Sequence, residues 1–428
     1  MGWKIIPGRE AKAVFSGMTM HTWRFGPALV CLLAACGSPR GGPVVRGEQV
    51  VRGDTAVIRA SGDGEWGPIQ DAVEEKRATN GEAPATFGQA SSAIALPSGG
   101  ALVFDVKAPG GPVLELFDSA ARFVTAIGRQ GKDLGQFQAL TVVSLAANRD
   151  GTIFVLDQPN SRVDRFAADG HALKPIPVGS VAANGSPDFL RAGANGSVYV
   201  WSYVVRERGL RDAEMTGYYQ YDSTGKVLDS IAPQHLWFPP PPRARYAPAD
   251  QWSALGDGRV ILSRTDLVGF LVKPAIGTNG MVLAMLDVPA AAIDTAERRQ
   301  IQTMVDFWDG QLLAHDKAPM QHEPVPDHKP AIREVMPDAD GRVWVQRNVA
   351  SVRVPPHPAP GASHLIQSFD QPTVWSAFRL NGNYLGDVRF PIGVRVIGVS
   401  DDVAWAVVPG KDERQVLVKY RIPGIVAK

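Results

Sequence analysis

Gly-Gly-Ala-Leu-Val-Phe-Asp, residues 99–105, decides the fold, because the chain repeats this short turn-and-strand unit at least five times. Each copy opens on a turn glycine, continues through four β-prone residues and ends on a polar residue. The other copies are Gly-Thr-Ile-Phe-Val-Leu-Asp (151–157), Gly-Ser-Val-Tyr-Val-Trp-Ser (196–202), Gly-Arg-Val-Ile-Leu-Ser-Arg (258–264) and Gly-Arg-Val-Trp-Val-Gln-Arg (341–347). Repetition on this scale indicates one supersecondary unit used many times.

A second hairpin signal follows the repeated unit. Residues 163–166 lead into Asp169-Gly170, and residues 375–378 lead into Asn381-Gly382. Asp-Gly and Asn-Gly favour a type I′ turn, because both central residues of that turn need a positive φ. Each unit therefore contains about four strands. Four-stranded antiparallel sheets repeated around a ring are the blades of a β-propeller.

The repeats predict an all-β fold, a six-bladed β-propeller over residues 53–428. Five blades are expected to begin near residues 92, 140, 188, 250 and 332. A sixth begins at Val394 and supplies three strands before the sequence ends. The ring then needs one strand from the N-terminal side, and Thr55–Ala60 is the best candidate. Closure of the ring removes the exposed edges that a single sheet would present.

Insertions interrupt the blade pattern at three places. Residues 234–249 carry four consecutive prolines and predict a stiff extended loop. Asp294-Thr-Ala-Glu297 resembles a capping box, and the apolar residues after it recur at helical spacing, which predicts a helix over 294–314. Residues 314–330 and 354–372 are rich in His and Pro and are expected to be loops.

The N-terminal stretch has the layout of a secretory signal. Residues 25–35 form an apolar run too short to span a bilayer, and Arg24 precedes it. Leu33-Ala34-Ala35-Cys36-Gly37 resembles the bacterial lipobox, in which the cysteine is acylated and becomes the new N-terminus. This predicts a signal over 1–36, starting at Met18 or Met20, and a flexible tether over 37–52. The alternatives are an ordinary signal that contains a cysteine, or a short buried helix.

The second repeat carries the family resemblance. Residues 128–137 contain Gly128-Arg-Gln-Gly131 and Gly135-Gln-Phe137, and residues 148–163 contain Asp150-Gly151, Asp157 and Asn160-Ser-Arg162-Val163. This pattern resembles an NHL repeat, specifically over about 120–175. As a whole the chain resembles the six-bladed propeller lipoproteins of bacteria, including a closing Phe-x-x-x-Gly…Leu-Gly motif at 378–386. The resemblance implies that the first strand of each blade lines a central channel, and it implies no single activity.

The composition limits which partners and cofactors the chain is expected to bind. Lys and Arg total 44 against 43 Asp and Glu, so the chain has no basic excess to attract nucleic acid. Both cysteines, Cys31 and Cys36, lie in the signal region, so the folded body is expected to have no disulfide and no thiol nucleophile. The histidines of the two loops match no compact ligand spacing. We therefore predict no cofactor and no metal residue, although a divalent metal in the channel stays open, and we expect a monomer.

The polar residues that end the repeated units are the candidate binding site. Equivalent positions in a ring gather at one rim, where Asp on one side and Arg on the other would suit a zwitterionic or acidic ligand. The candidates are Asp105, Asp157, Ser202, Arg264 and Arg347, together with Arg162. The alternative is that these residues are polar because strand ends meet solvent, and that Asp157 and Arg162 make an internal loop contact.

These features predict a lipid-anchored propeller outside the cytoplasm. Cys36 is the expected lipidation site, and Gly37-Ser38 after it, with no Asp at position 37, favours the outer membrane. The propeller is expected to bind an unidentified protein or small ligand and to act as a binding or scaffold module. The alternative function is a metal-dependent hydrolase or lyase of the lactonase-like propeller type, with its site in the central channel.

Overall fold

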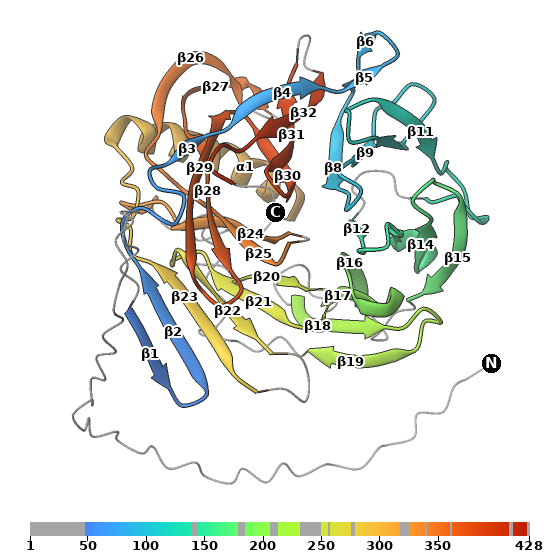
Figure 1. Ribbon diagram of the computed structural model, residues 1–428. Coiled ribbons are helices and arrows are strands. Elements are labelled where there is room, and N and C mark those ends of the chain that lie inside the picture. Colours follow the sequence, from blue (N-terminus) through green and yellow to red (C-terminus); the bar gives the residue numbers. More distant parts are fainter. Residues whose placement is uncertain are drawn as a thin grey trace, which may run out of the picture. The chain divides into compact units, whose positions relative to one another are not determined.

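The computed structural model describes residues 48–138, 144–178, 185–205, 213–231, 250–255, 257–274, 279–316, 325–338, 340–359, 362–410 and 414–425. Its main strands form six sheets arranged around a common axis (Figure 1). The predicted six-bladed propeller is therefore confirmed. The signal region and the greater part of the expected tether lie outside the described residues, as does residue range 232–249 with its proline run.

The first three blades are four-stranded antiparallel sheets, described here from the axis outward. Blade 1 consists of β8 (Ala90–Ala95), β9 (Ala101–Asp105), β10 (Val113–Phe117) and β11 (Phe123–Ile127). Blade 2 consists of β12 (Leu145–Ala147), β13 (Ile153–Asp157), β14 (Arg162–Phe166) and β15 (Ala172–Pro177), with a 3-10 turn at Gln158–Asn160. Blade 3 consists of β16 (Gly185–Ala192), β17 (Val198–Val205), β18 (Ala213–Tyr221) and β19 (Val227–Ile231), with a 3-10 turn at Ala194–Gly196.

The other three blades add strands from the N-terminal segment to their own. Blade 4 consists of β20 (Asp250–Ala254), β21 (Val260–Arg264), β22 (Gly269–Lys273), β23 (Met281–Leu286), β2 (Thr55–Ala60) and β1 (Glu48–Arg52). Blade 5 consists of β24 (Ile332–Pro337), β25 (Arg342–Arg347), β28 (Pro372–Arg379), β29 (Tyr384–Ile392) and β3 (Gln70–Asp71). Blade 6 consists of β30 (Arg395–Ser400), β31 (Val403–Pro409), β32 (Gln415–Arg421) and β4 (Val73–Arg77), and β7 (Thr86–Phe87) also pairs with β32.

The repeated turn glycines work as the sequence predicts. They sit between the first and second strand of a blade, where the tight turn requires a left-handed backbone that glycine adopts without a steric cost. Their φ angles are 80° at Gly99, 86° at Gly151, 72° at Gly196, 88° at Gly258 and 77° at Gly341. The repeats therefore mark the second strand of each blade, one strand outside the axis.

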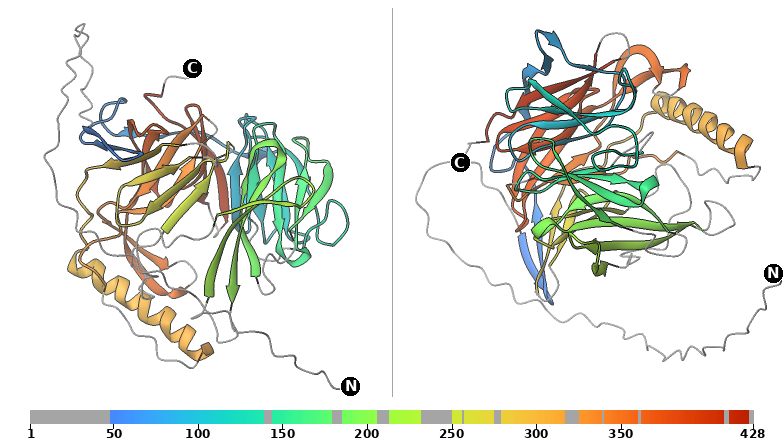
Figure 2. Two further views of the ribbon diagram at one scale, coloured as in Figure 1. Left: turned by 90° about the horizontal axis from the view of Figure 1, so that it is seen from below. Right: turned by 90° about the vertical axis from the view of Figure 1, so that its right-hand side faces the viewer.

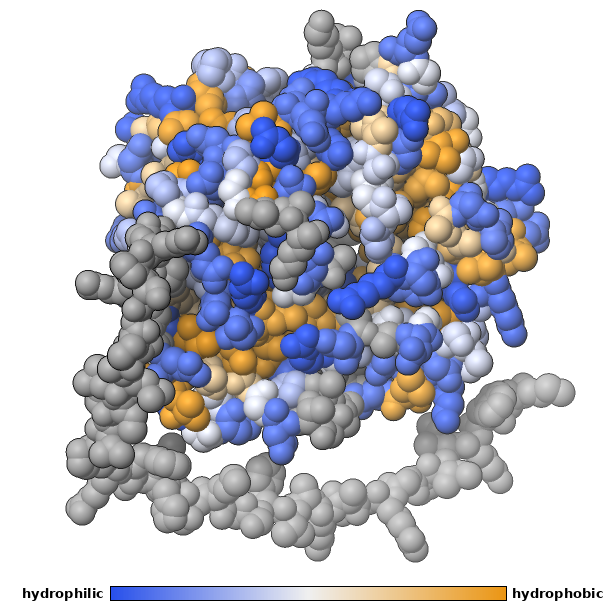
Figure 3. Space-filling model, viewed as in Figure 1, coloured by the Kyte–Doolittle hydropathy of each residue, from blue (hydrophilic) through white to orange (hydrophobic). Residues whose placement is uncertain are grey.

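Apolar side chains fill the spaces between neighbouring blades. Phe104 and Phe137 meet edge to face between blades 1 and 2, with 5.7 Å between ring centroids. Phe390 and Tyr420 meet in the same way between blades 5 and 6, at 5.5 Å. Full burial of one such ring contributes about 1.5–3 kcal/mol. This packing holds each blade against the next and fixes the ring. On the outer part of blade 4 several apolar residues remain half-buried, and a hydrophobic area is visible over this blade in Figure 3.

The N-terminal segment runs along the outer edges of three consecutive blades. β2 pairs in parallel with β23 of blade 4, β3 pairs in parallel with β29 of blade 5, and β4 pairs antiparallel with β32 of blade 6. An N-terminal strand does complete the last blade, but the expectation that Thr55–Ala60 is that strand is wrong. The strand that completes blade 6 is β4, a run of exposed and mostly charged residues. We call residues 48–87 the belt.

Two elements project from one end of the ring (Figure 2). The predicted helix is confirmed as α1 (Thr295–Asp316), and Asp294 caps it by accepting hydrogen bonds from the N–H groups of Ala296 and Glu297 at 2.7 and 2.8 Å. The second element is a hairpin of β26 (Val352–Ala359) and β27 (Ala362–Asp370). The expectation of a loop over 354–372 is therefore wrong, because this stretch pairs with itself despite its prolines. A smaller hairpin joins β5 (Thr79–Asn80) and β6 (Ala83–Pro84).

Candidate functional site

The predicted rim residue Asp105 lies at the end of β9 and is buried. Its carboxylate accepts hydrogen bonds from the backbone N–H groups of Gly88 at 2.9 Å, Gln89 at 2.9 Å and Lys107 at 3.0 Å. These contacts fix the turn that leads into β8, the innermost strand of blade 1. Asp105 thus holds the backbone of the rim.

Asp157 and Arg162 make the internal loop contact that the sequence offered as an alternative. Arg162 Nε lies 3.7 Å from Asp157 Oδ2 and 2.9 Å from Asp164 Oδ1. The same guanidinium donates to the carbonyl oxygens of Lys132, Asp133 and Gln136 and so holds the loop before blade 2. Burial raises the pKa of Asp164 to about 7, with a further contribution from the neighbouring Asp157 and an opposing one from Arg162.

The other two arginines of the predicted rim also have partners on the protein. Arg264 pairs with Asp266 in the turn after β21. Arg347 pairs with Asp387, whose other carboxylate oxygen accepts a hydrogen bond from Ser376 at 2.6 Å. Ser202 lies within β17, and its side chain is outside the described part, as is Cys36. The rim positions are thus brought to one end of the ring without converging on one point, and their role in ligand binding stays a prediction.

A different group of charges lies on the innermost strands, which surround the axis (Figure 1). Glu334 on β24 and Arg395 on β30 are both accessible to solvent, and they come from the neighbouring blades 5 and 6. A β-bulge in β24 falls between Ile332 and Glu334, a type of irregularity that re-aims side chains next to binding sites. We call Glu334, Arg395 and Arg191 of β16 the axial site.

Hydrogen bonds to the backbone and to neighbouring strands hold both arginines in place. Arg395 donates from Nη2 to the carbonyl oxygen of Ala90 on β8, at 2.7 Å. Arg191 donates to its neighbour Leu190 at 2.9 Å and to the hydroxyl of Ser253 on β20 at 3.2 Å. The side chains involved come from blades 3, 4, 5 and 6, and Ala90 belongs to blade 1. The axial site therefore exists only in the closed ring.

The surroundings of the axial site shift the pKa values of Glu334 and Arg395. Burial raises the pKa of Glu334, although the charges of Arg191, Arg395 and Arg333 lower it in part. Burial likewise lowers the pKa of Arg395, and Glu334 offsets this in part. The side chain of Glu334 is exposed to solvent, although enough protein lies around it to disfavour its charged form. Among the described residues, Glu334 has no hydrogen-bond or ion-pair partner, and it faces three positive charges.

The axial site lies at the same end of the ring as the predicted rim. Ala90 pairs with Asp105, and Ile332, two residues before Glu334, pairs with Arg347. The rim positions are on the second strands, so they lie one strand further from the axis. Glu334 and Arg395 could have been identified from the sequence, because each is a charged residue near the start of a blade's first strand, in an otherwise apolar pattern.

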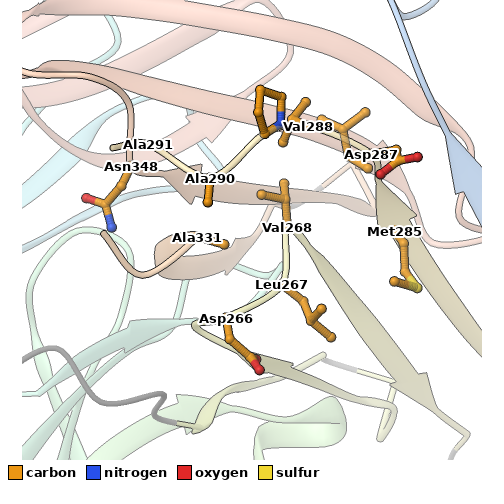
Figure 4. Close-up of a pocket in the computed structure, with 12 residues that line it drawn as sticks. Asp266, Leu267, Val268, Met285, Asp287, Val288, Ala290, Ala291, Ala331 and Asn348 are labelled. Carbon is orange, nitrogen blue, oxygen red and sulfur yellow. The ribbon is translucent and has the colours of Figure 1, made fainter. Parts of the chain in front are cut away.

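A pocket of about 160 Å³ opens between blades 4 and 5 (Figure 4). Asp266, Leu267 and Val268 line it from the turn after β21, and Asn348 lines it from the chain after β25. Asn348 donates to the carbonyl oxygen of Pro330 at 2.7 Å and accepts from Gln371 at 2.7 Å. Asp266 and Asn348 therefore both have partners on the protein, and Asp287 also lines the pocket.

Within the part of the chain that the structure describes, no three His, Cys, Asp or Glu side chains gather as a protein metal site would require. Over the same residues, no helix combines the length and the apolar character that a bilayer crossing needs.

Comparison with known proteins gives only distant likenesses. No family model matches the sequence, and no curated protein matches it. Among solved structures, a DUF4221 family member from Bacteroides vulgatus is 12% identical over 82% of this chain and 98% of that one, with a TM-score of 0.46. A Bacteroides fragilis protein assigned as exported is 12% identical over 86% and 99%, with a TM-score of 0.44. A gluconolactonase from Xanthomonas campestris is 12% identical over 83% and 99%, with a TM-score of 0.39. At this identity the likeness concerns the propeller fold alone.

Proposed function

We propose that this chain is a lipid-anchored propeller of the bacterial cell envelope, at the outer membrane, that binds a small ligand at the axial site. The lipobox-like Leu33-Ala34-Ala35-Cys36 supports the anchor. Several acyl chains on one N-terminal cysteine would make a durable anchor.

One observation carries the binding role. Glu334 and Arg395 are partly desolvated charges on adjacent innermost strands, and no ion pair joins them. Both side chains are exposed, and a charged group whose pKa the surrounding protein shifts is a candidate functional group. Such a site costs stability in the free protein and recovers it when a ligand supplies the missing partners.

The stability of the unliganded protein tests this role. Glu334→Gln should raise the melting temperature by about 1–2 °C at pH 8, since it removes a desolvated charge that has no direct partner. Asp387→Asn is the matched control, because the same chemical change there removes a carboxylate that Arg347 and Ser376 contact. That variant should melt at a lower temperature. A loss of stability in Glu334→Gln equal to that of the control would mean that Glu334 is a structural residue and would refute the proposal.

Fractionation of cells tests the anchor separately. Cys36→Ser should release the protein from the membrane fraction into the soluble periplasmic fraction. Cys31→Ser is the matched control, because Cys31 lies inside the apolar run and not at the lipobox position. It should leave the protein with the membranes. A Cys36→Ser protein that still sediments with membranes would show that the anchor is wrong and would leave the axial site untouched.

A further inference from the structure

We propose that the ligand of the axial site is a small acidic zwitterion, with at least one carboxylate held by Arg395 and Arg191 and an amine held by Glu334. This inference rests on the proposed binding role and specifies its chemistry. The two functional groups of the ligand match the two kinds of charge that the ring brings to its axis.

The arginines would recognise the anionic group of the ligand. A guanidinium group has five N–H donors and no acceptor. Arg395 uses one of them on the carbonyl oxygen of Ala90, and the described residues accept no other hydrogen bond from it. That single contact orients the group and leaves its fork free for a carboxylate, the geometry in which Arg binds best.

Glu334 would recognise the cationic group of the ligand. Its carboxylate is an acceptor only, and no donor among the described residues reaches it. Glu334 and Arg395 lie on the innermost strands of neighbouring blades, and no ion pair joins them among the described residues. An ammonium there would restore the partner that Glu334 lacks.

The balance of charge favours an acidic ligand over a neutral zwitterion. Arg191, Arg333 and Arg395 act on Glu334 together, so three positive charges surround one negative charge. A ligand with one amine and two carboxylates carries a net charge of −1, so it lowers the positive excess of the site and still offers an ammonium to Glu334, which a neutral zwitterion or a plain dicarboxylate cannot both do. An α-amino acid with an acidic side chain is the simplest molecule of this class.

Calorimetric titration of the full-length protein in detergent tests the inference. The probes are L-glutamate, glutarate, which keeps both carboxylates and lacks the amine, and γ-aminobutyrate, which lacks one carboxylate. Wild-type protein should bind L-glutamate about tenfold more tightly than glutarate, which corresponds to about 1.4 kcal/mol. It should bind γ-aminobutyrate more weakly than L-glutamate by a similar factor.

Two variants separate the two halves of the site. Glu334→Gln should make the affinities for L-glutamate and glutarate equal, because the amine loses its partner. Arg395→Gln should weaken both ligands at least tenfold. Arg389→Gln is the control, since Arg389 forms an exposed ion pair with Asp71 at the outer edge of blade 5, and its affinities should match the wild type.

Three results would overturn the inference: no binding of any probe, equal affinity for L-glutamate and glutarate in the wild type, or affinities that Arg395→Gln leaves unchanged. Each of these concerns the identity of the ligand. The stability comparison of Glu334→Gln with Asp387→Asn is made without a ligand, so its outcome separately decides whether the axial site is functional.

Discussion

The ammonium group of Lys329 lies 3.0 Å from the carboxylate of Glu297, and both side chains are almost fully buried beneath α1. Lys329 also donates to the carbonyl oxygen of Val349 at 3.0 Å, to Ser351 at 2.6 Å and to Gln371 at 3.0 Å. One ammonium thus ties the first turn of the helix to the chain that leads into and out of the β26–β27 hairpin.

Lys329→Met should therefore destabilise the protein by about 3–5 kcal/mol, because it leaves the Glu297 carboxylate buried without its counter-charge. Chemical denaturation at pH 7 measures the effect. Asp327→Asn is the control, since Asp327 pairs with Arg298 at the surface and is 83% exposed. Asp327→Asn should change the free energy of unfolding by less than about 0.5 kcal/mol. Equal effects of the two substitutions would contradict a structural role for the buried pair.

Asp164 should make the stability depend on pH between about 4 and 7. Its pKa is raised to about 7 in the folded protein, so the folded state holds the proton more tightly than the unfolded state does. The stability that this proton contributes is complete below the unfolded pKa near 3.8 and is lost as the pH rises through about 7.

Asp164→Asn should remove this pH dependence. The variant should be more stable than the wild type by about 1–3 kcal/mol at pH 8 and nearly equal to it at pH 4. Denaturation curves at both values measure the difference. Arg162 keeps its contacts with Asp157 and with three carbonyl groups, so the loop before blade 2 should survive. A variant less stable at pH 8 would show that the Arg162 pair outweighs the burial of Asp164.

Asp105→Asn should lower the stability by about 2 kcal/mol. The amide replaces one acceptor oxygen with a donor, so at least one of the three N–H groups that Asp105 serves is left without a partner. Thermal unfolding measures the loss. Asp71→Asn, at a carboxylate that is 66% exposed, should change the stability by less than about 0.5 kcal/mol. An unchanged Asp105→Asn protein would free this residue for the ligand-binding role that the sequence suggested.

Trp66→Ala should loosen the belt. The backbone N–H of Trp66 donates to the carbonyl oxygen of Leu385 at 2.7 Å, and its ring lies 5.8 Å from that of Trp344. Removal of the half-buried ring should cost about 3 kcal/mol, the lower end of the range for aromatic truncations. Hydrogen exchange should rise in β3 and β4 more than in β12–β15. Uniform exchange across all blades would mean that the belt does not open separately.

The sequence could predict the blades because each depends on local rules. A glycine at the turn, such as Gly151, and an apolar strand after it determine a hairpin wherever it occurs. The partner of an outer strand is a different matter, because Thr55–Ala60 and Val73–Arg77 both lie near the start of the chain. Thr55–Ala60 has the higher β propensity, yet Val73–Arg77 completes blade 6, since pairing depends on where the belt passes.

The axial charges could not be predicted from local pattern either. Arg333-Glu334 in an apolar strand has the appearance of a solvent-facing pair, and nothing in the sequence distinguishes the outer solvent from the axis. Only closure of the ring brings Glu334 near Arg191, a residue from two blades earlier. The sequence did single out Asp105 and Arg347, which pair with the first strands at the end of the ring where the axial charges lie.

The belt also orders the events of synthesis and folding. β4 leaves the ribosome long before its partner β32. Contacts so distant in the chain form slowly, because a long loop must close first. Blade 6 therefore stays incomplete until β32 has been made, and the ring of a nascent chain remains open for as long.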